Sequence, residues 1–124
     1  MKIGKSARVN MFYLFIGEDE PAKQEKIHSL KNELLKKGFE DFNYEALDAK
    51  ELTLSLFKEA LSRLPLESPQ RIMVIKNVFK LKDELKDYFA AQMESLSKDL
   101  IIILEASVIP KEESAFFNKI SRYG

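Results

Sequence analysis

The residues best placed for phosphate chemistry follow the first apolar run of the chain, at 11–16. They read Gly17-Glu18-Asp19-Glu20-Pro21-Ala22-Lys23-Gln24. A P-loop needs glycines whose backbone N–H groups cradle phosphate, a Gly-Lys pair for charge, and Ser or Thr for magnesium. This segment has one glycine, no Gly-Lys pair, and three carboxylates where phosphate would lie. Because like charges repel, we interpret residues 17–20 as a degenerate phosphate loop that holds no cofactor.

The same carboxylates invite comparison with a receiver domain, where acidic residues after strand one hold Mg²⁺ beside an aspartate that ends strand three. The third apolar run, at 71–75, ends in Lys76-Asn77, so that aspartate is missing. The acidic pair with which a nucleotidase would hold Mg²⁺ is missing there too. Carboxylates at a helix N-terminus stabilise the helix by capping N–H groups and by opposing the macrodipole. We favour this structural role, and keep a receiver-like signalling domain and an atypical nucleotide-binding enzyme as alternatives.

The chain has few residues that could bind a metal ion or act as a nucleophile. The chain has no cysteine and one histidine, His28, beside Ile27 within an expected helix. Thiolate zinc sites and cysteine nucleophiles are therefore excluded, and no Ser-His-Asp set can be assembled. We predict no catalytic residue and no metal site, and interpret His28 as a surface residue.

One loop stands out as a candidate for binding a partner. It reads Leu64-Pro65-Leu66-Glu67-Ser68-Pro69 and lies between an expected helix and a buried strand. Two prolines stiffen the segment, so leucines that project from it would bind an apolar pocket with little loss of entropy. The other interpretation is that Leu64 and Leu66 cap the core.

Composition narrows the class of protein. The 124 residues are 45% hydrophobic and 32% charged, with net charge zero, as expected for one globular domain. A basic excess, typical of proteins that bind nucleic acid or anionic membranes directly, is absent. No apolar run approaches the roughly 18 to 20 residues of a membrane helix. We expect a cytoplasmic protein with no membrane partner.

The elements that position these residues alternate between strand and helix. Strands are expected at 11–16, 43–47, 71–75 and 100–104, and the last two are apolar throughout, as in central parallel strands. The first helix should begin near Asp19 and end after Lys37, because Gly38 follows. One face of this helix should be apolar, because spacings of three and four residues separate Ile27, Leu30, Leu34 and Leu35. A second helix should begin at the N-cap Thr53, turn Leu54, Phe57 and Leu61 inward, and stop at Pro65. Later helices are expected at about 82–95 and after Pro110. This alternation predicts an α/β fold: a Rossmann-like, three-layer αβα domain with a mainly parallel sheet of at least four strands.

We expect residues 1–10 to be a flexible N-terminal extension and residues 11–124 to form the domain. The last residues resemble the exit of a helix, after which a doubly wound sheet usually places another strand. We therefore expect the domain to be truncated before its last strand.

Six pieces of the chain carry a resemblance to a known family: Tyr13–Glu20, Phe42–Glu45, Leu47–Leu52, Ala60–Ser68, Arg71–Asn77 and Leu100–Glu105. In this order and spacing they resemble the N-terminal AAA+ domain of the delta subunit of the bacterial DNA polymerase III clamp loader. The match extends over about residues 12 to 120 and rests on the order and spacing of its pieces rather than on one signature.

The resemblance implies a non-catalytic DNA replication subunit. Delta has a Rossmann-like AAA+ module without a functional P-loop, and it opens the ring-shaped sliding clamp by inserting hydrophobic residues. In the family these lie between the second helix and the third strand, which corresponds here to Leu64, Pro65 and Leu66. Many relatives carry aromatic residues there, whereas this chain has Leu66 followed by Glu67. The implied partners are the sliding clamp and, through C-terminal domains outside this chain, other clamp-loader subunits, with DNA contacted only indirectly.

Overall fold

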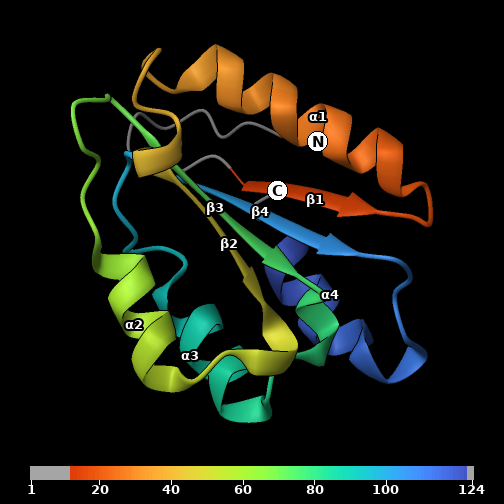
Figure 1. Cartoon of the computed structure of the whole chain (residues 1–124). Coiled ribbons are helices and arrows are strands. Elements are labelled where there is room, and N and C mark those ends of the chain that lie inside the picture. The colour runs from red at the N-terminus through yellow and green to blue at the C-terminus, as the bar shows by residue number, and fades with distance from the viewer. Residues whose placement is uncertain (1–11, 123–124) are drawn as a thin grey trace.

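The computed structural model describes residues 12–122, in which strands and helices alternate (Figure 1). The predicted extension at 1–10 and Met11 lie outside the described residues. The strands are β1 (Phe12–Ile16), β2 (Tyr44–Asp48), β3 (Arg71–Lys76) and β4 (Leu100–Ala106). The α-helices are α1 (Glu20–Leu34), α2 (Leu54–Ser62), α3 (Asp83–Gln92) and α4 (Ser114–Ser121). Short 3-10 turns are η1 (Asp41–Asn43), η2 (Ala49–Glu51), η3 (Val78–Lys80) and η4 (Lys111–Glu113).

The described strands form one sheet in the order β1-β4-β3-β2, and every neighbouring pair is parallel. The apolar strands β3 and β4 occupy the centre, where a strand is covered on both faces. This confirms the predicted α/β fold with a parallel sheet. Because all strands run the same way, their carboxyl ends meet at one edge of the sheet, and the loops that precede them meet at the opposite edge.

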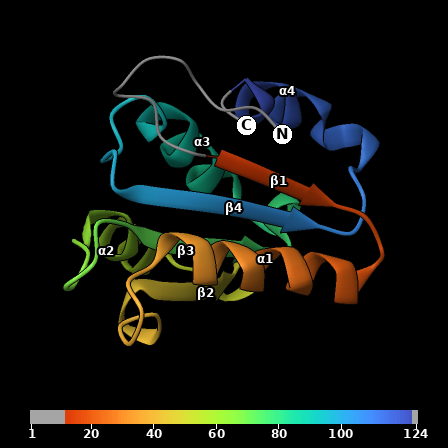
Figure 2. The same ribbon diagram turned by 90° about the horizontal axis from the view of Figure 1, so that it is seen from above.

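Helices cover both faces of the sheet, as predicted. Helix α1 lies on one face, whereas α2, α3 and α4 lie on the other (Figures 1 and 2). Alternate residues of β3 divide between the two layers: Met73 and Ile75 face α2 and α3, and Ile72 and Val74 face α1. The domain is therefore a three-layer αβα sandwich.

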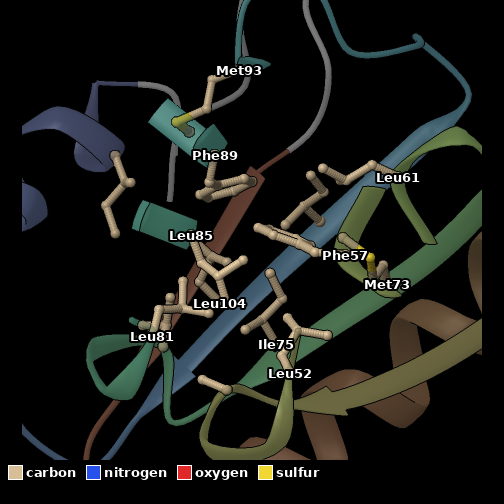
Figure 3. Packing of buried hydrophobic residues seen from close by; sticks show 14 of the residues in the cluster. Leu52, Phe57, Leu61, Met73, Ile75, Leu81, Leu85, Phe89, Met93 and Leu104 are labelled. Carbon is tan, nitrogen blue, oxygen red and sulfur yellow. The ribbon is translucent and has the colours of Figure 1, made fainter. Parts of the chain in front are cut away.

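The larger core lies between the sheet and α2, α3 and α4 (Figure 3). Phe57 and Phe89 are fully buried, and their ring centroids are 5.6 Å apart. Full burial of such a side chain contributes about 1.5–3 kcal/mol, so these rings anchor α2 and α3 to the sheet. The smaller core contains Ile27 and Leu35, which the helical spacing predicted to face inward.

Several boundaries differ by a few residues from those predicted, and for two of them the structure shows the cause. Helix α1 ends at Leu34 instead of Lys37, because Leu35 turns to an extended conformation that buries its side chain in the core. Gly38 lies beyond the helix, in a turn with φ +90°. Strand β2 begins at Tyr44 instead of Asn43, because Asn43 closes the turn η1 and directs its carboxamide inward.

Candidate functional site

Ligands of parallel α/β sheets bind at the carboxyl ends of the strands, and here that edge contains a buried ion pair. Lys23, in the first turns of α1, places its ammonium 2.5 Å from a carboxylate oxygen of Glu105 at the end of β4. Only 7% of each side chain is exposed. The Lys23 ammonium also lies 2.7 Å from the carboxylate of Glu20. The ammonium of Lys23 is thus neutralised by the chain's own carboxylates.

The polar network continues across the sheet to β3 and β2. The backbone N–H of Asn77 donates to Glu105 Oε1 at 3.1 Å, and the Asn77 carboxamide donates to Asp48 at 3.3 Å. Asn77 has φ +57°, in the left-handed region that Asn tolerates better than most residues. Three strand ends are therefore linked by side chains.

The charges of this network shift the pKa values of its members. Burial lowers the pKa of the Lys23 ammonium, but hydrogen bonds and charges from Glu105 and Glu20 outweigh burial and leave that pKa raised. The hydrogen bond from Lys23 lowers the pKa of Glu20. The backbone N–H of Lys50 lowers the pKa of Asp48, helped by Asn77. All three groups are therefore held in their charged forms at neutral pH.

The edge formed by the carboxyl ends of the strands is poorly suited to bind phosphate. Asp19 caps α1 by accepting a hydrogen bond from the N–H of Ala22 at 3.1 Å, and Glu18, Asp19 and Glu20 are exposed carboxylates. The predicted helix-capping role of these acids is confirmed for Asp19. Among residues 12–122, no group of three or more histidine, cysteine, aspartate or glutamate side chains is arranged to hold a metal ion. His28 is exposed on α1, as predicted.

The loop at residues 63–70, between α2 and β3, lies at the opposite edge of the sheet and presents apolar side chains to solvent. Leu64 is 76% exposed and Leu66 is 49% exposed, whereas Pro65 between them is half-buried. The alternative in which the leucines cap the core is therefore wrong. Glu67 follows with φ +54°, a left-handed conformation that turns the chain toward β3.

Hydrogen bonds hold this exposed loop to the body of the domain. The buried carboxamide of Asn43 binds the backbone of Leu66 on both sides: Oδ1 accepts from the Leu66 N–H at 2.6 Å, and Nδ2 donates to the Leu66 carbonyl at 2.7 Å. The hydroxyl of Ser68 accepts from the N–H of Lys36, just beyond α1, at 3.2 Å. The loop is therefore exposed but anchored.

Arginines fix the two ends of the loop. Arg63, at the end of α2, lies 2.5 Å from Glu45 of β2. Arg71, at the start of β3, donates to the carbonyl of Ala60 at 2.7 Å and lies 3.3 Å from Glu45. Burial lowers the pKa of the Arg71 guanidinium, although the Glu45 carboxylate opposes this. Helix and strand are thus joined directly beside the loop.

Sequence reasoning missed three of these residues. The sequence interpretation treated Lys23 only as a possible phosphate ligand. Its partner in the structure is Glu105, and the signal in the sequence was an acid placed directly after an apolar strand. Asn43 was placed in a strand, and Phe42, which is 69% exposed, was assigned no function. Both belong to the piece Phe42–Glu45 that carried part of the family resemblance, which marked the position without explaining it.

Together, the strand order and the helices on both faces define a three-layer α/β domain with a parallel sheet. A family model described as DNA polymerase III, delta subunit, matches residues 13–121. The chain belongs to the DNA polymerase III delta subunit family.

Solved structures show the same fold. The DNA clamp loader delta protein of Bacillus subtilis aligns with a TM-score of 0.76 at 16% identity, over 94% of this chain and 37% of that protein. A DNA polymerase III gamma subunit-related protein from Thermotoga maritima aligns with a TM-score of 0.69 at 12% identity, over 94% of this chain and 40% of that one. This chain therefore spans less than half the length of either structure. A search of curated proteins found no match.

Across residues 12–122, no helix has both the length and the apolar character needed to cross a membrane.

Proposed function

We propose that this domain is a non-catalytic part of a clamp loader and binds the sliding clamp through Leu64, Pro65 and Leu66. The observation that carries the proposal is an apolar pair, 76% and 49% exposed, on a loop that is nevertheless anchored. Apolar side chains that are exposed in the isolated domain often mark a surface that a partner protein covers. Membership of the delta subunit family supports the sliding clamp as that partner, because clamp loaders act on sliding clamps.

The leucines can supply a useful part of the binding free energy. Full burial of a leucine side chain is worth about 1.5–3 kcal/mol. Scaled by the exposed fractions of Leu64 and Leu66, insertion of both would contribute roughly 2–4 kcal/mol. That corresponds to a change of about 30-fold to several hundred-fold in Kd.

Phe42 is an exposed aromatic residue beside the residue that anchors the loop. It lies in η1, directly before Asn43, whose carboxamide binds the backbone of Leu66. Its ring is 69% exposed and contacts that of Phe39, with 6.3 Å between centroids. The chain thus has an exposed aromatic residue next to Asn43, which binds the loop, whereas positions 64–67 have no aromatic residue. We assign Phe42 a supporting role in the contact.

The other proposed partners rest on family membership. The clamp would open because its open state fits the inserted residues better, which shifts the population toward the open ring. Other loader subunits would be reached through domains outside this chain, and DNA only through the assembly. A replication subunit of this kind would act in the cytoplasm. The alternatives of an atypical nucleotide-binding enzyme and a receiver-like domain are less well supported. Lys23 is paired with Glu105, and β3 ends at Lys76 with Asn77 following, so no aspartate stands there.

The test is a titration of the 124-residue chain with the sliding clamp of the same organism, by calorimetry or surface plasmon resonance. Wild type is compared with the double variant Leu64→Ser plus Leu66→Ser. Leu56→Ser is a matched control, because Leu56 is 51% exposed but lies in the first turn of α2, at the far end of that helix from the loop.

We expect the double variant to bind at least about 30-fold more weakly than wild type, whereas Leu56→Ser should bind like wild type. Circular dichroism should show that all three are folded. Equal binding by wild type and the double variant would place the contact elsewhere. Absence of binding by a folded wild type would remove the proposed function.

A further inference from the structure

Asn43 is a buried polar side chain whose hydrogen bonds are all directed at loops. Its exposed fraction is 0%, and it lies at the end of η1, 23 residues before Leu66. Its Nδ2 donates to the carbonyl of Phe39 at 2.9 Å and to that of Leu66 at 2.7 Å. Its Oδ1 accepts from the N–H of Leu66 at 2.6 Å. Burial of a carboxamide is unfavourable unless its groups are paired, and here they are.

The pairing with Leu66 fixes the direction of one residue. A carboxamide that binds both the N–H and the carbonyl of the same residue acts like a neighbouring peptide group in a sheet. Both backbone groups of Leu66 then face inward toward Asn43, which leaves its side chain half exposed. The Ser68 hydroxyl holds the loop two residues later, so Leu66 is ordered before any partner arrives.

We propose that Asn43 is a positioning residue for clamp binding: its carboxamide holds Leu66 in the conformation that the clamp receives. This inference rests on the proposed function, and it adds a residue that does not itself touch the partner. An ordered loop loses less conformational entropy on binding than a free one. Loss of the Asn43 contacts should therefore weaken clamp binding although Leu64 and Leu66 are unchanged.

Asn43→Asp is the sharpest variant, because it keeps the shape and replaces Nδ2 by oxygen. At neutral pH the introduced carboxylate has no hydrogen to donate and repels the carbonyls of Leu66 and Phe39. At acid pH a protonated carboxyl offers one O–H donor and one acceptor, and so can restore both bonds to Leu66. The matched control is Asn32→Asp, the same chemical change on an exposed residue of α1.

Affinity for the clamp is measured per folded molecule, by titration at pH values from 7.5 to 5, with the folded fraction taken from urea unfolding. We expect Asn43→Asp to bind about tenfold more weakly than wild type at pH 7.5. The difference in clamp affinity between wild type and Asn43→Asp should become smaller as pH falls. Asn32→Asp should match wild type throughout. A purely structural role would lower the folded fraction and leave the affinity of folded molecules unchanged.

Hydrogen exchange of the wild-type chain gives a second measurement that no folding defect can obscure. The Leu66 amide, bound to a buried oxygen, should exchange at least about tenfold more slowly than the Leu64 amide. Equal exchange at the two positions, or tight clamp binding by folded Asn43→Asp at pH 7.5, would overturn the proposal. If wild type itself does not bind the clamp, the proposed function fails; slow exchange at Leu66 would then still show the Asn43 contact, but its role in binding would be refuted.

Discussion

Replacement of Lys23 by methionine is the most direct test of the network at the carboxyl ends of the strands. Methionine keeps much of the length and apolar character of the lysine stem but removes the ammonium that neutralises Glu105. The Glu105 carboxylate then stays in a site where only 7% of its side chain is exposed. It keeps the hydrogen bond from the N–H of Asn77 at 3.1 Å.

The expected loss of stability is large for a domain of this size. Removal of one partner from a buried ion pair costs about 3–5 kcal/mol. Because Asn77 still donates to Glu105, we take the lower limit, about 3 kcal/mol. For a chain of 124 residues, this corresponds to a fall in Tm of roughly 10 to 15 °C.

Urea unfolding followed by circular dichroism gives the free energy of unfolding for wild type, Lys23→Met, Glu105→Gln and the double variant. Glu105→Gln should cost less than Lys23→Met, because Glu20 still pairs with the ammonium at 2.7 Å. The double variant should regain much of the loss, because neither buried charge remains. The four values form a double-mutant cycle that isolates the pair.

Lys119→Met is the control, since Lys119 is exposed on α4 and its replacement should change stability by less than about 0.5 kcal/mol. The reasoning would be refuted if the free energy of unfolding of Lys23→Met lay within about 1 kcal/mol of that of wild type. It would fail equally if the double variant lost as much free energy of unfolding as the two single variants together, because the two charges would then be uncoupled.

Two further predictions concern the loop and the sheet edge. Phe42→Ser should weaken clamp binding by less than the double leucine variant does and leave Tm nearly unchanged, because Phe42 is 69% exposed; titration and thermal melts check this, and unchanged affinity would exclude Phe42 from the contact. Asp48→Asn should alter stability little at pH 7, because asparagine also caps η2. The lowered pKa of Asp48 makes its stabilising contribution present above its ordinary value of 3.8 and lost as pH falls through the lower folded value. Urea unfolding between pH 5 and 3 should therefore show a steeper loss for wild type than for Asp48→Asn, and parallel curves would refute this.

Local pattern was sufficient for the elements and their class. The apolar runs at 71–75 and 100–104 predicted central strands, and β3 and β4 are central and buried. Spacings of three and four residues predicted the inward faces of α1 and α2, and Thr53 was correctly predicted to cap α2. These predictions succeed because period and capping depend on residues close together in the chain.

The predicted boundaries of α1 and β2 were wrong because contacts with residues far away in the chain decided them. Helix α1 could have continued to Gly38 on local grounds, but Leu35 leaves the helix to reach the core formed with β1, β3 and β4. The alternation around Asn43 resembles a strand, yet a contact with Leu66, 23 residues away, holds it in a turn. Such contacts depend on the packing of whole elements, which local pattern does not contain.

Residue types at short spacing were enough to predict the α/β class, the poor match to a phosphate loop and the stiffened loop with two leucines. Packing between segments far apart in the chain settled which charges meet and which leucines face solvent. Lys23 and Glu105 are 82 residues apart and are joined because β1 lies beside β4 in the sheet. The exposure of Leu64 and Leu66 depends on how α2, β3 and η1 surround the loop, so only the folded chain could distinguish a presented surface from a core cap.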